Sequence, residues 1–300
     1  RGGVDRRHQP PRVRLKRGAA APLGSAAKAP PRRAGRDGEL LAGARAHYED
    51  PGYYTEAYRD RGEDVAFYGR VAAEHGGPVL EYGVGNGRIA LPLARAGHDV
   101  WGVDHSAPML ADLRARLAGE PPPVRRRVRL REGDMRRVRL GRRFPLVVCP
   151  FNTALHLYTR ADVEAFFARV RAHLEPRGRF VVDLSMPMLE ALVRDPNKAY
   201  TLPRFRHPTT GEVVKYREHF DYDRARQVLF VSMVFEPVRP GGETFCTPLA
   251  HRQFFPQEWE AFLHYNGFAV ESVAGDYSGG PLERHSDVMV WTARRRRGFS

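Results

Sequence analysis

Several features of other protein classes are missing from this sequence. It has only two cysteines in 300 residues, Cys149 and Cys246, too few for a disulfide framework or a cysteine-based metal site. No apolar run is long enough to span a membrane, and no secretory leader is recognisable. The H-E-x-x-H pattern and a nucleophile elbow are absent, which argues against metal-dependent and serine-nucleophile hydrolysis. We therefore expect a cytoplasmic protein with no bound metal and no membrane partner.

The positive charge of the chain is concentrated at its two ends. The formal net charge is +14, of which +9 lies in residues 1–46 and +4 in Arg294 to Arg297, so residues 47–293 carry only +1. Residues 1–37 are rich in Arg, Ala, Pro and Gly and are expected to be a disordered basic tail; residues 294–300 are expected to be a second one. Because the region between them is nearly neutral, a nucleic acid is an unlikely partner.

The rest of the chain reads as one α/β unit with additions. Residues 38–77 are predicted to form a helical N-terminal cover. Residues 78–293 then alternate strands and helices, as in a parallel sheet with crossovers. A β-rich insertion of antiparallel strands is predicted at about 200–255, before the last helix. The expected fold is α/β, a Rossmann-like seven-stranded sheet with a helical cover and an antiparallel β insertion.

The most informative segment is residues 79–88, an apolar strand followed by a glycine-rich turn. Asp104 ends the next apolar strand, an arrangement that suits a nucleoside-bearing cofactor. A dinucleotide fingerprint would require glycine where Arg88 stands. Glu81 would disfavour a pyrophosphate but suits the cationic S-adenosylmethionine. The turn glycines, which leave room for close approach, are Gly83, Gly85 and Gly87.

The run VLEYGVGNGRIALPLARAGHDVWGVDHSAPML resembles the first two motifs of the class I S-adenosylmethionine-dependent methyltransferase family. The resemblance extends over roughly residues 48–293. It implies S-adenosyl-L-methionine as cofactor, with the glycine turn under its methionine part. It also implies that Glu81 favours the ammonium end, Asp104 the ribose hydroxyls and Asp134 the adenine amine, while Met135 lines the ring.

Three further residues are candidates for the cofactor site, each with an alternative. Met109 either touches the adenine or packs in the core. Arg88 either reaches the cofactor carboxylate or is a solvated residue in the first helical turn. Tyr58 either contacts the cofactor from a lid, as N-terminal helices of the family often do, or packs its helix onto the domain.

The segment after the fourth strand lies where the family places its fourth motif, beside the transferred methyl group. It begins with Cys149 and Pro150 in place of the acid that many relatives carry. It also lacks the Asn/Asp-Pro-Pro-aromatic motif of base- and amide-methylating relatives. His156 is the candidate general base, because histidine titrates near neutrality; the alternative is a structural histidine at a loop–helix junction. Asn152 could either orient the acceptor or contact the methionine part of the cofactor. His251, His264 and His285 are not distinguished by any spacing.

The sequence thus predicts an enzyme that methylates an N or O atom of a small-molecule acceptor. An RNA methyltransferase steered by the basic tails and a non-catalytic S-adenosylmethionine-binding protein remain as alternatives. A nicotinamide-dependent oxidoreductase is disfavoured by Glu81 and Arg88. The sequence does not indicate an oligomeric state.

Overall fold

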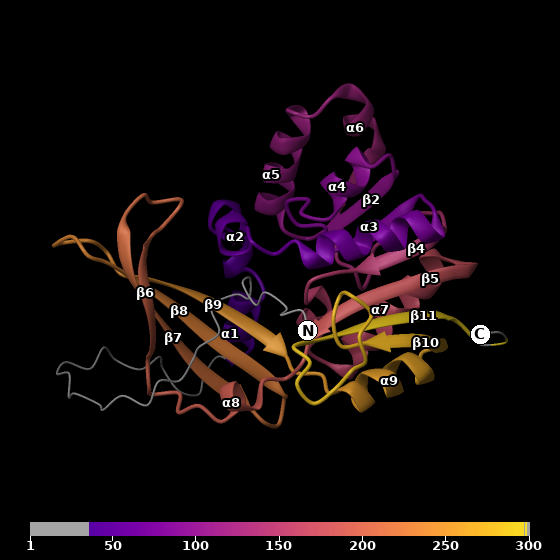
Figure 1. Cartoon of the computed structure of the whole chain (residues 1–300). Coiled ribbons are helices and arrows are strands. Elements are labelled where there is room, and N and C mark those ends of the chain that lie inside the picture. Colours follow the sequence, from indigo (N-terminus) through magenta and orange to yellow (C-terminus); the bar gives the residue numbers. More distant parts are fainter. Residues whose placement is uncertain (1–35, 297, 299–300) are drawn as a thin grey trace, which may run out of the picture.

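The computed structural model describes residues 36–296 and 298, which form two β-sheets and surrounding helices (Figure 1). The larger sheet has the strand order β10-β11-β5-β4-β1-β2-β3. Its strands are parallel except β11, which is antiparallel to both β5 and β10. The predicted seven-stranded sheet with a closing antiparallel hairpin is therefore confirmed. The strands are β1 Val79–Tyr82, β2 Val100–Asp104, β3 Val128–Glu132, β4 Phe144–Cys149, β5 Leu174–Ser185, β10 Phe268–Ala274 and β11 Val288–Arg295.

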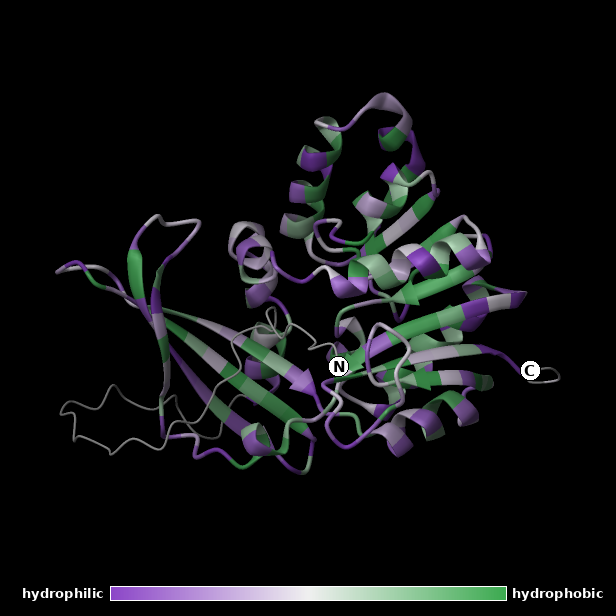
Figure 2. Cartoon of the chain, viewed as in Figure 1, coloured by the Kyte–Doolittle hydropathy of each residue, from purple (hydrophilic) through white to green (hydrophobic). Residues whose placement is uncertain are grey.

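Helices cover both faces of this sheet, because its central strands are apolar on both sides. Along β4, Leu146 and Val148 belong to one hydrophobic cluster, whereas Val147 and Cys149 belong to the other. This alternation is the two-residue period of a strand, and Figure 2 shows the strands as largely hydrophobic. One face packs against α3 Glu63–His75, α4 Ala90–Arg95 and α5 Ala107–Ala118; the other packs against α7 Arg160–His173 and α9 Pro256–Tyr265.

The smaller sheet is antiparallel and lies beside the N-terminal helices (Figure 1). Its strands are β6 Tyr200–Arg206, β7 Val213–Asp223, β8 Val228–Pro237 and β9 Phe245–Arg252. The helical elements against it are α1 Arg36–Gly43, η1 Ala46–Tyr48 and α2 Pro51–Ala57. A Cβ on Gly43 would lie 2.7 Å from Cβ of Ala250, so α1 lies directly on β9. Tyr53 stacks on His207 at 5.2 Å between ring centroids. These contacts join the beginning of the chain to the insertion.

Local signals placed several elements correctly. Ser106 caps α5, and Thr159 caps α7 in a capping box with Asp162, which satisfies free backbone N–H groups at each helix start. The helical segment expected over residues 38–77 is present as four elements, α1, η1, α2 and α3. Another expectation, a loop from Glu120 to Pro123, was wrong, because α6 Pro122–Arg127 begins within it. Two elements were not predicted at all, β6 and α8 Leu189–Leu192.

The predicted tails differ from the structure where the two overlap. Residues 1–35 of the expected N-terminal tail lie outside the described residues, but Arg36 and Asp37 begin α1. At the other end, Arg294 and Arg295 belong to β11 and pair with Ala269 and Phe268 of β10. The expected boundaries of the cover and the methyltransferase domain stay predictions. Within the described part of the chain, no helix combines the length and apolarity that a membrane crossing needs.

Candidate functional site

The turn between β1 and α4 depends on glycine for its backbone conformation and its space. Gly83, Gly85 and Gly87 have φ values of +70°, +52° and +86°, a region that side-chain-bearing residues rarely adopt. A Cβ on Gly83 would lie 2.3 Å from Oγ1 of Thr153, and one on Gly87 would lie 2.4 Å from Cδ1 of Leu113. Glycine is therefore required at these three positions, where Thr153 and Leu113 pack closely against the turn. The turn lies at the carboxyl edge of the sheet, where α/β proteins bind ligands.

Asp104 is fastened to this turn through its carboxylate. Oδ2 accepts a hydrogen bond from the backbone N–H of Gly85, and Oδ1 accepts one from the N–H of Ser106, each at 2.8 Å. The two strands come together because β1 and β2 are parallel neighbours, with Tyr82 opposite Val103. A carboxylate offers about four lone-pair positions, so the Asp104 carboxylate retains acceptor capacity for hydroxyl groups.

Glu81, at the third position of β1, is almost completely buried, with 2% of its surface exposed. Among the described residues, its Oε2 has no hydrogen-bond partner. Burial raises the pKa of the Glu81 carboxyl well above its ordinary value, although Arg88 opposes this shift. Leaving a buried acceptor unpaired costs about 1–3 kcal/mol. A cationic or hydrogen-bond-donating ligand beside Glu81 would remove that cost.

Arg88 is neither solvated nor free. Its Nη1 donates to Oδ1 of Asp64 at 2.8 Å, and its Nη2 bonds Oδ2 of the same carboxylate. Asp64 lies in the first turn of α3, and the guanidinium also lies over the Phe151 ring, 4.2 Å from its centroid. The solvated alternative for Arg88 is therefore wrong. Its predicted contact with the cofactor carboxylate stays a prediction, since the described contacts tie Arg88 to the helical cover.

The predicted adenine residues lie after β2 and β3. Met109 is buried in α5, and a Cβ on Gly85 would lie 3.2 Å from its Cε. Asp134 accepts hydrogen bonds from the backbone N–H and the guanidinium of Arg136. Burial would raise the pKa of Asp134, but these bonds outweigh it and lower the pKa. Met135 is half-buried and packs against the larger hydrophobic cluster. The Asp134 carboxylate is thus ionised and already committed to Arg136.

The loop after β4 has two consecutive residues in the left-handed region, Phe151 at φ +54° and Asn152 at φ +64°. Both ends of the Asn152 amide bind Ser185, the last residue of β5. Nδ2 donates to its Oγ at 2.8 Å, and Oδ1 accepts from its backbone N–H at 2.6 Å. In this structure Asn152 therefore fixes the loop to the neighbouring strand, and its predicted role toward the acceptor stays a prediction.

His156 ends the short helix η2 Thr153–His156 and has both ring nitrogens occupied. The Tyr158 hydroxyl donates to the carbonyl oxygen of Ala250 at 2.9 Å. Since a hydroxyl has one proton, Tyr158 accepts from Nδ1–H of His156 at 3.0 Å. Nε2 then accepts from the Tyr48 hydroxyl at 2.7 Å. This network assigns the Nδ1–H tautomer, and burial lowers the pKa of His156 well below its ordinary value.

Two further histidines, from distant segments of the chain, lie beside His156 and Tyr48. The ring centroid of His251 in β9 lies 5.0 Å from that of His156. His47 in η1 bonds the Tyr58 hydroxyl through Nε2 at 3.0 Å. Nδ1 of His47 and Nε2 of His251 are buried without a partner among the described residues. Burial lowers the pKa of His47 to about 4 and that of His251 to about 3.

The structure thus distinguishes histidines that the sequence could not. His251 joins the site, whereas His285 is exposed and His264 contacts Arg296. Tyr58 packs edge-on against Phe151 at 4.8 Å between ring centroids, as its packing alternative described. The tyrosine-dense segment over 48–58 was the available signal for Tyr48, but nothing in the sequence pairs it with His156.

Asp183, near the end of β5, was also missed as a candidate. It is buried and accepts from the Tyr68 hydroxyl at 2.5 Å, from the Tyr277 hydroxyl at 2.9 Å and from the backbone N–H of Phe151 at 3.0 Å. Burial raises its pKa, although these hydrogen bonds oppose the shift. Asp183 therefore links the helical cover, the β4 loop and the segment after β10 at one point. The described residues contain no cluster of metal-ligating side chains.

Comparisons with known proteins agree with this geometry. A family model described as a methyltransferase domain matches residues 79–178, the span from the glycine turn to the start of β5. A dTDP-3-amino-3,6-dideoxy-alpha-D-glucopyranose N,N-dimethyltransferase of Streptomyces fradiae is 35% identical over 126 residues, which are 42% of this chain and 46% of that protein. The chain spans about half the length of the curated relatives that it matches first.

Similar solved structures extend the likeness over most of the chain. The CcbJ methyltransferase of Streptomyces caelestis has a TM-score of 0.69 and 26% identity, covering 78% of this chain and 96% of that one. CalS10 of Micromonospora echinaspora, an amino pentose methyltransferase solved with S-adenosylmethionine bound, has a TM-score of 0.60 and 25% identity. That match covers 81% of this chain and 96% of that one.

Proposed function

Since this chain belongs to the class I S-adenosylmethionine-dependent methyltransferase family, we propose that it is an enzyme that methylates a nitrogen atom of a small molecule, with S-adenosylmethionine as methyl donor. When bound, S-adenosylmethionine supplies an electrophilic methyl group on a cationic sulfur. The described residues fit this group. Glu81 has an unpaired buried oxygen, Asp104 retains acceptor capacity beside the turn, and the turn has glycine at its three positive-φ positions.

Each of these groups has a distinct part in the proposal. Glu81 ionises beside the ammonium end of the cofactor, because an adjacent cation favours the charged carboxylate. Asp104 accepts from the ribose hydroxyls while its bonds to Gly85 and Ser106 hold it in place. Asn152 and Asp183 hold the β4 loop against β5. A rigid loop is what this reaction needs, since much of methyl transfer consists of holding the reacting atoms in line.

The histidines favour an amine over a hydroxyl as acceptor. A hydroxyl must lose its proton to become a good nucleophile, and a general base works best when its pKa is near the operating pH. His156 and His251 have pKa values far below neutrality, so neither stores a proton readily. A neutral amine attacks without prior proton loss. The same burial that keeps the histidines neutral would also favour the uncharged form of an amine.

The relatives point to the class of amine. Their names describe N,N-dimethyltransferases of dTDP-linked amino sugars, an amino pentose methyltransferase and a glycopeptide N-methyltransferase. We therefore expect an amino sugar or a glycosylated small molecule as acceptor here. Side chains of η1, η2 and β9 supply polar atoms beside such a substrate, notably the unpaired nitrogens of His47 and His251. Both cysteines are free, which supports a reducing compartment such as the cytoplasm.

The observation that carries the proposal is the Asp104 carboxylate bound to the backbone of the glycine-rich turn after β1. It is tested by titration calorimetry of the full chain with S-adenosylmethionine. This is followed by transfer of a labelled methyl group to a panel of amino sugars and their hydroxyl analogues. We expect one-to-one cofactor binding and transfer to amines only. A folded protein that binds no cofactor would refute the proposal, whereas binding without transfer to any compound in a cell extract would indicate a non-catalytic binding protein.

A further inference from the structure

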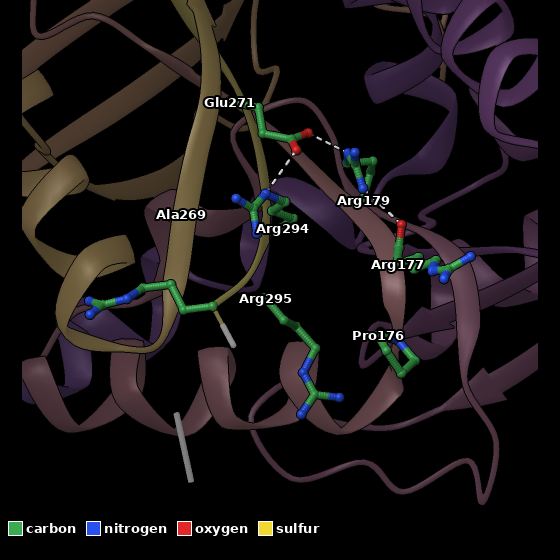
Figure 3. A pocket seen from close by; sticks show the side chains of 8 residues that line it. Pro176, Arg177, Arg179, Ala269, Glu271, Arg294 and Arg295 are labelled. Carbon is green, nitrogen blue, oxygen red and sulfur yellow. Dashed lines mark hydrogen bonds and ion pairs between the residues drawn. The ribbon is translucent and has the colours of Figure 1, made fainter. Parts of the chain in front are cut away.

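An arginine-lined groove lies at the start of β5 and the end of β11 (Figure 3). Its cavity measures about 630 Å³, within the range of about 300–1,000 Å³ of small-molecule sites. Six charged side chains line it: Arg177, Arg179, Arg294, Arg295, Arg296 and Glu271. Together they carry a charge of +4, whereas residues 47–293 as a whole carry only +1. The groove is therefore a local concentration of positive charge.

Two of the arginines are held in place by the same carboxylate. Glu271 bonds Nε of Arg179 through Oε2 and Nε of Arg294 through Oε1, the latter at 3.1 Å (Figure 3). Arg179 also donates to the carbonyl oxygen of Arg177 at 2.7 Å. Among the described residues, the terminal amino groups of Arg294 and the guanidinium of Arg177 have no hydrogen-bond partner. The groove thus offers oriented guanidinium donors that the protein does not use.

The positive charge is also felt by a neighbouring side chain. Arg171, on α7, has a lowered pKa because of burial and because of the charges of Arg295 and Arg169. Guanidinium groups bind phosphate oxygens through paired N–H donors.

The groove is separate from the cofactor site. Ala293 of β11 pairs with Phe180, whereas Val290 pairs with Asp183, so the groove and the Asp183 end lie at opposite ends of the same strand pair. Arg179 and Asp183 are four residues apart in β5, or about 13 Å along an extended strand. A ligand in the groove would therefore leave the glycine turn free.

We propose that this groove is a second binding site, which takes the diphosphate of a nucleoside diphosphate. Arg177 and Arg294 contact the phosphate oxygens, and Glu271 keeps Arg179 and Arg294 oriented toward them. The inference does not depend on the methyltransferase proposal, because it uses residues at the other end of the sheet.

The test is titration calorimetry of the full chain with ADP and with inorganic pyrophosphate at 150 mM salt, where exposed charges more than about 8 Å apart are largely screened. Saturating S-adenosylhomocysteine is present, so that the cofactor site does not contribute. We expect both probes to bind one-to-one. Binding should weaken about tenfold or more in the double variant Arg177→Ala/Arg294→Ala, with an unchanged melting temperature, because both side chains are exposed.

The matched control is Arg125→Ala/Arg126→Ala, which removes the same charge from exposed positions on α6, next to β3 at the far edge of the sheet. We expect this control to bind both probes within about twofold of the parent chain. Equal losses in the two double variants, or no binding of either probe, would refute the site. Tight binding of a DNA oligonucleotide without binding of ADP would also refute it, in favour of a nucleic-acid surface.

Discussion

The hydroxyl of Tyr48 lies 2.7 Å from Nε2 of His156, joining two residues that are 108 positions apart in the sequence. Tyr48 ends η1, and its backbone carbonyl also accepts from the Ser106 hydroxyl at 3.3 Å. One residue of the N-terminal segment therefore touches both the segment after Asp104 and the loop after β4. The cofactor residues and the candidate acceptor residues are connected through it.

The tautomer of His156 gives the first prediction. Because Tyr158 donates to Ala250, the His156 ring should carry its proton on Nδ1. Because burial lowers its pKa well below the ordinary value of about 6.5, the ring should still be neutral at a pH where an ordinary histidine is mostly protonated. Nitrogen-15 NMR of histidine-labelled protein measures both properties. A proton on Nε2, or an imidazolium at pH 6, would contradict the assigned network.

Asp104→Ala should weaken S-adenosylmethionine binding by roughly 100-fold or more, because it removes the proposed acceptor of the ribose hydroxyls as well as the anchor of Gly85. The control is Asp99→Ala, a half-exposed carboxylate next to the other end of β2 that pairs with Arg127 and Arg129. Calorimetry should give the control an affinity close to that of the parent chain. Similar losses of affinity in both variants would show that the effect comes from the loss of any negative charge and not from the loss of a specific contact at Asp104.

Glu81 should make cofactor binding depend on pH. Its pKa is raised in the folded protein, so before a cation arrives the carboxyl keeps its proton to a higher pH than an ordinary glutamate does. Binding should therefore release a proton, and the affinity should rise as pH increases through the raised pKa. Calorimetry in buffers of different ionisation enthalpy measures this release. In Glu81→Gln we expect weaker binding with no proton release; a variant that still releases a proton would assign it to another group.

Alanine variants of two glycines should distinguish the cost of backbone strain from the cost of a steric clash. Gly83 and Gly141 have φ values of +70° and +68°, but only Gly83 has neighbours that a Cβ would strike, in Thr153. Gly141→Ala should lower the free energy of unfolding by about 1 kcal/mol. Gly83→Ala should cost at least about twice as much and also impair cofactor binding. Denaturant titrations of both variants test this, and equal losses would mean that Thr153 moves aside without cost.

Acid should destabilise the protein beginning near pH 6.5. The pKa of His47 is about 4 in the folded protein, against 6.5 normally. Its contribution to stability is therefore fully present above pH 6.5 and is lost as pH falls toward 4, where the unfolded chain binds a proton that the folded one rejects. The full effect is about 3 kcal/mol. The free energy of unfolding of His47→Gln should fall less steeply over this interval. An unchanged slope in this variant would show that His47 is not the source of the pH dependence.

The elements that the sequence predicted well are those determined by neighbouring residues. The helix Pro256–Tyr265 and the strand Phe268–Ala274 match the predicted bounds, because proline starts the helix and Asn266-Gly267 ends it. The start of α6 was missed for a related reason. The three prolines at 121–123 suggested a loop, yet proline is well suited to the first turn of a helix. β6 was missed because its pairing with β7 is interrupted between Leu202 and Phe205 and leaves no regular alternation.

Within the candidate site, too, the residues that could be predicted are those close together in the sequence. The glycine turn and Asp104 could be predicted because both belong to one βαβ segment with fixed spacing. The contacts of His156 could not, because Tyr48, Ala250 and His251 reach it from three separate parts of the chain. Arg88 shows the same limit, since its partner Asp64 lies in a helix that precedes the sheet. Long-range pairing of polar groups leaves no periodic pattern in a sequence.

The ion pairs between α1 and the turn that joins β7 to β8 also bear on the order in which this protein folds during synthesis. Arg36 in α1 bonds Asp223, 187 residues later, at 2.6 Å, and Arg226 bonds Asp37 at 2.9 Å. On a ribosome that adds about 5–20 residues per second, α1 waits about 10–40 s for its partner strands. Helix α1 is therefore synthesised long before the strands that it contacts. Such non-local closure slows folding.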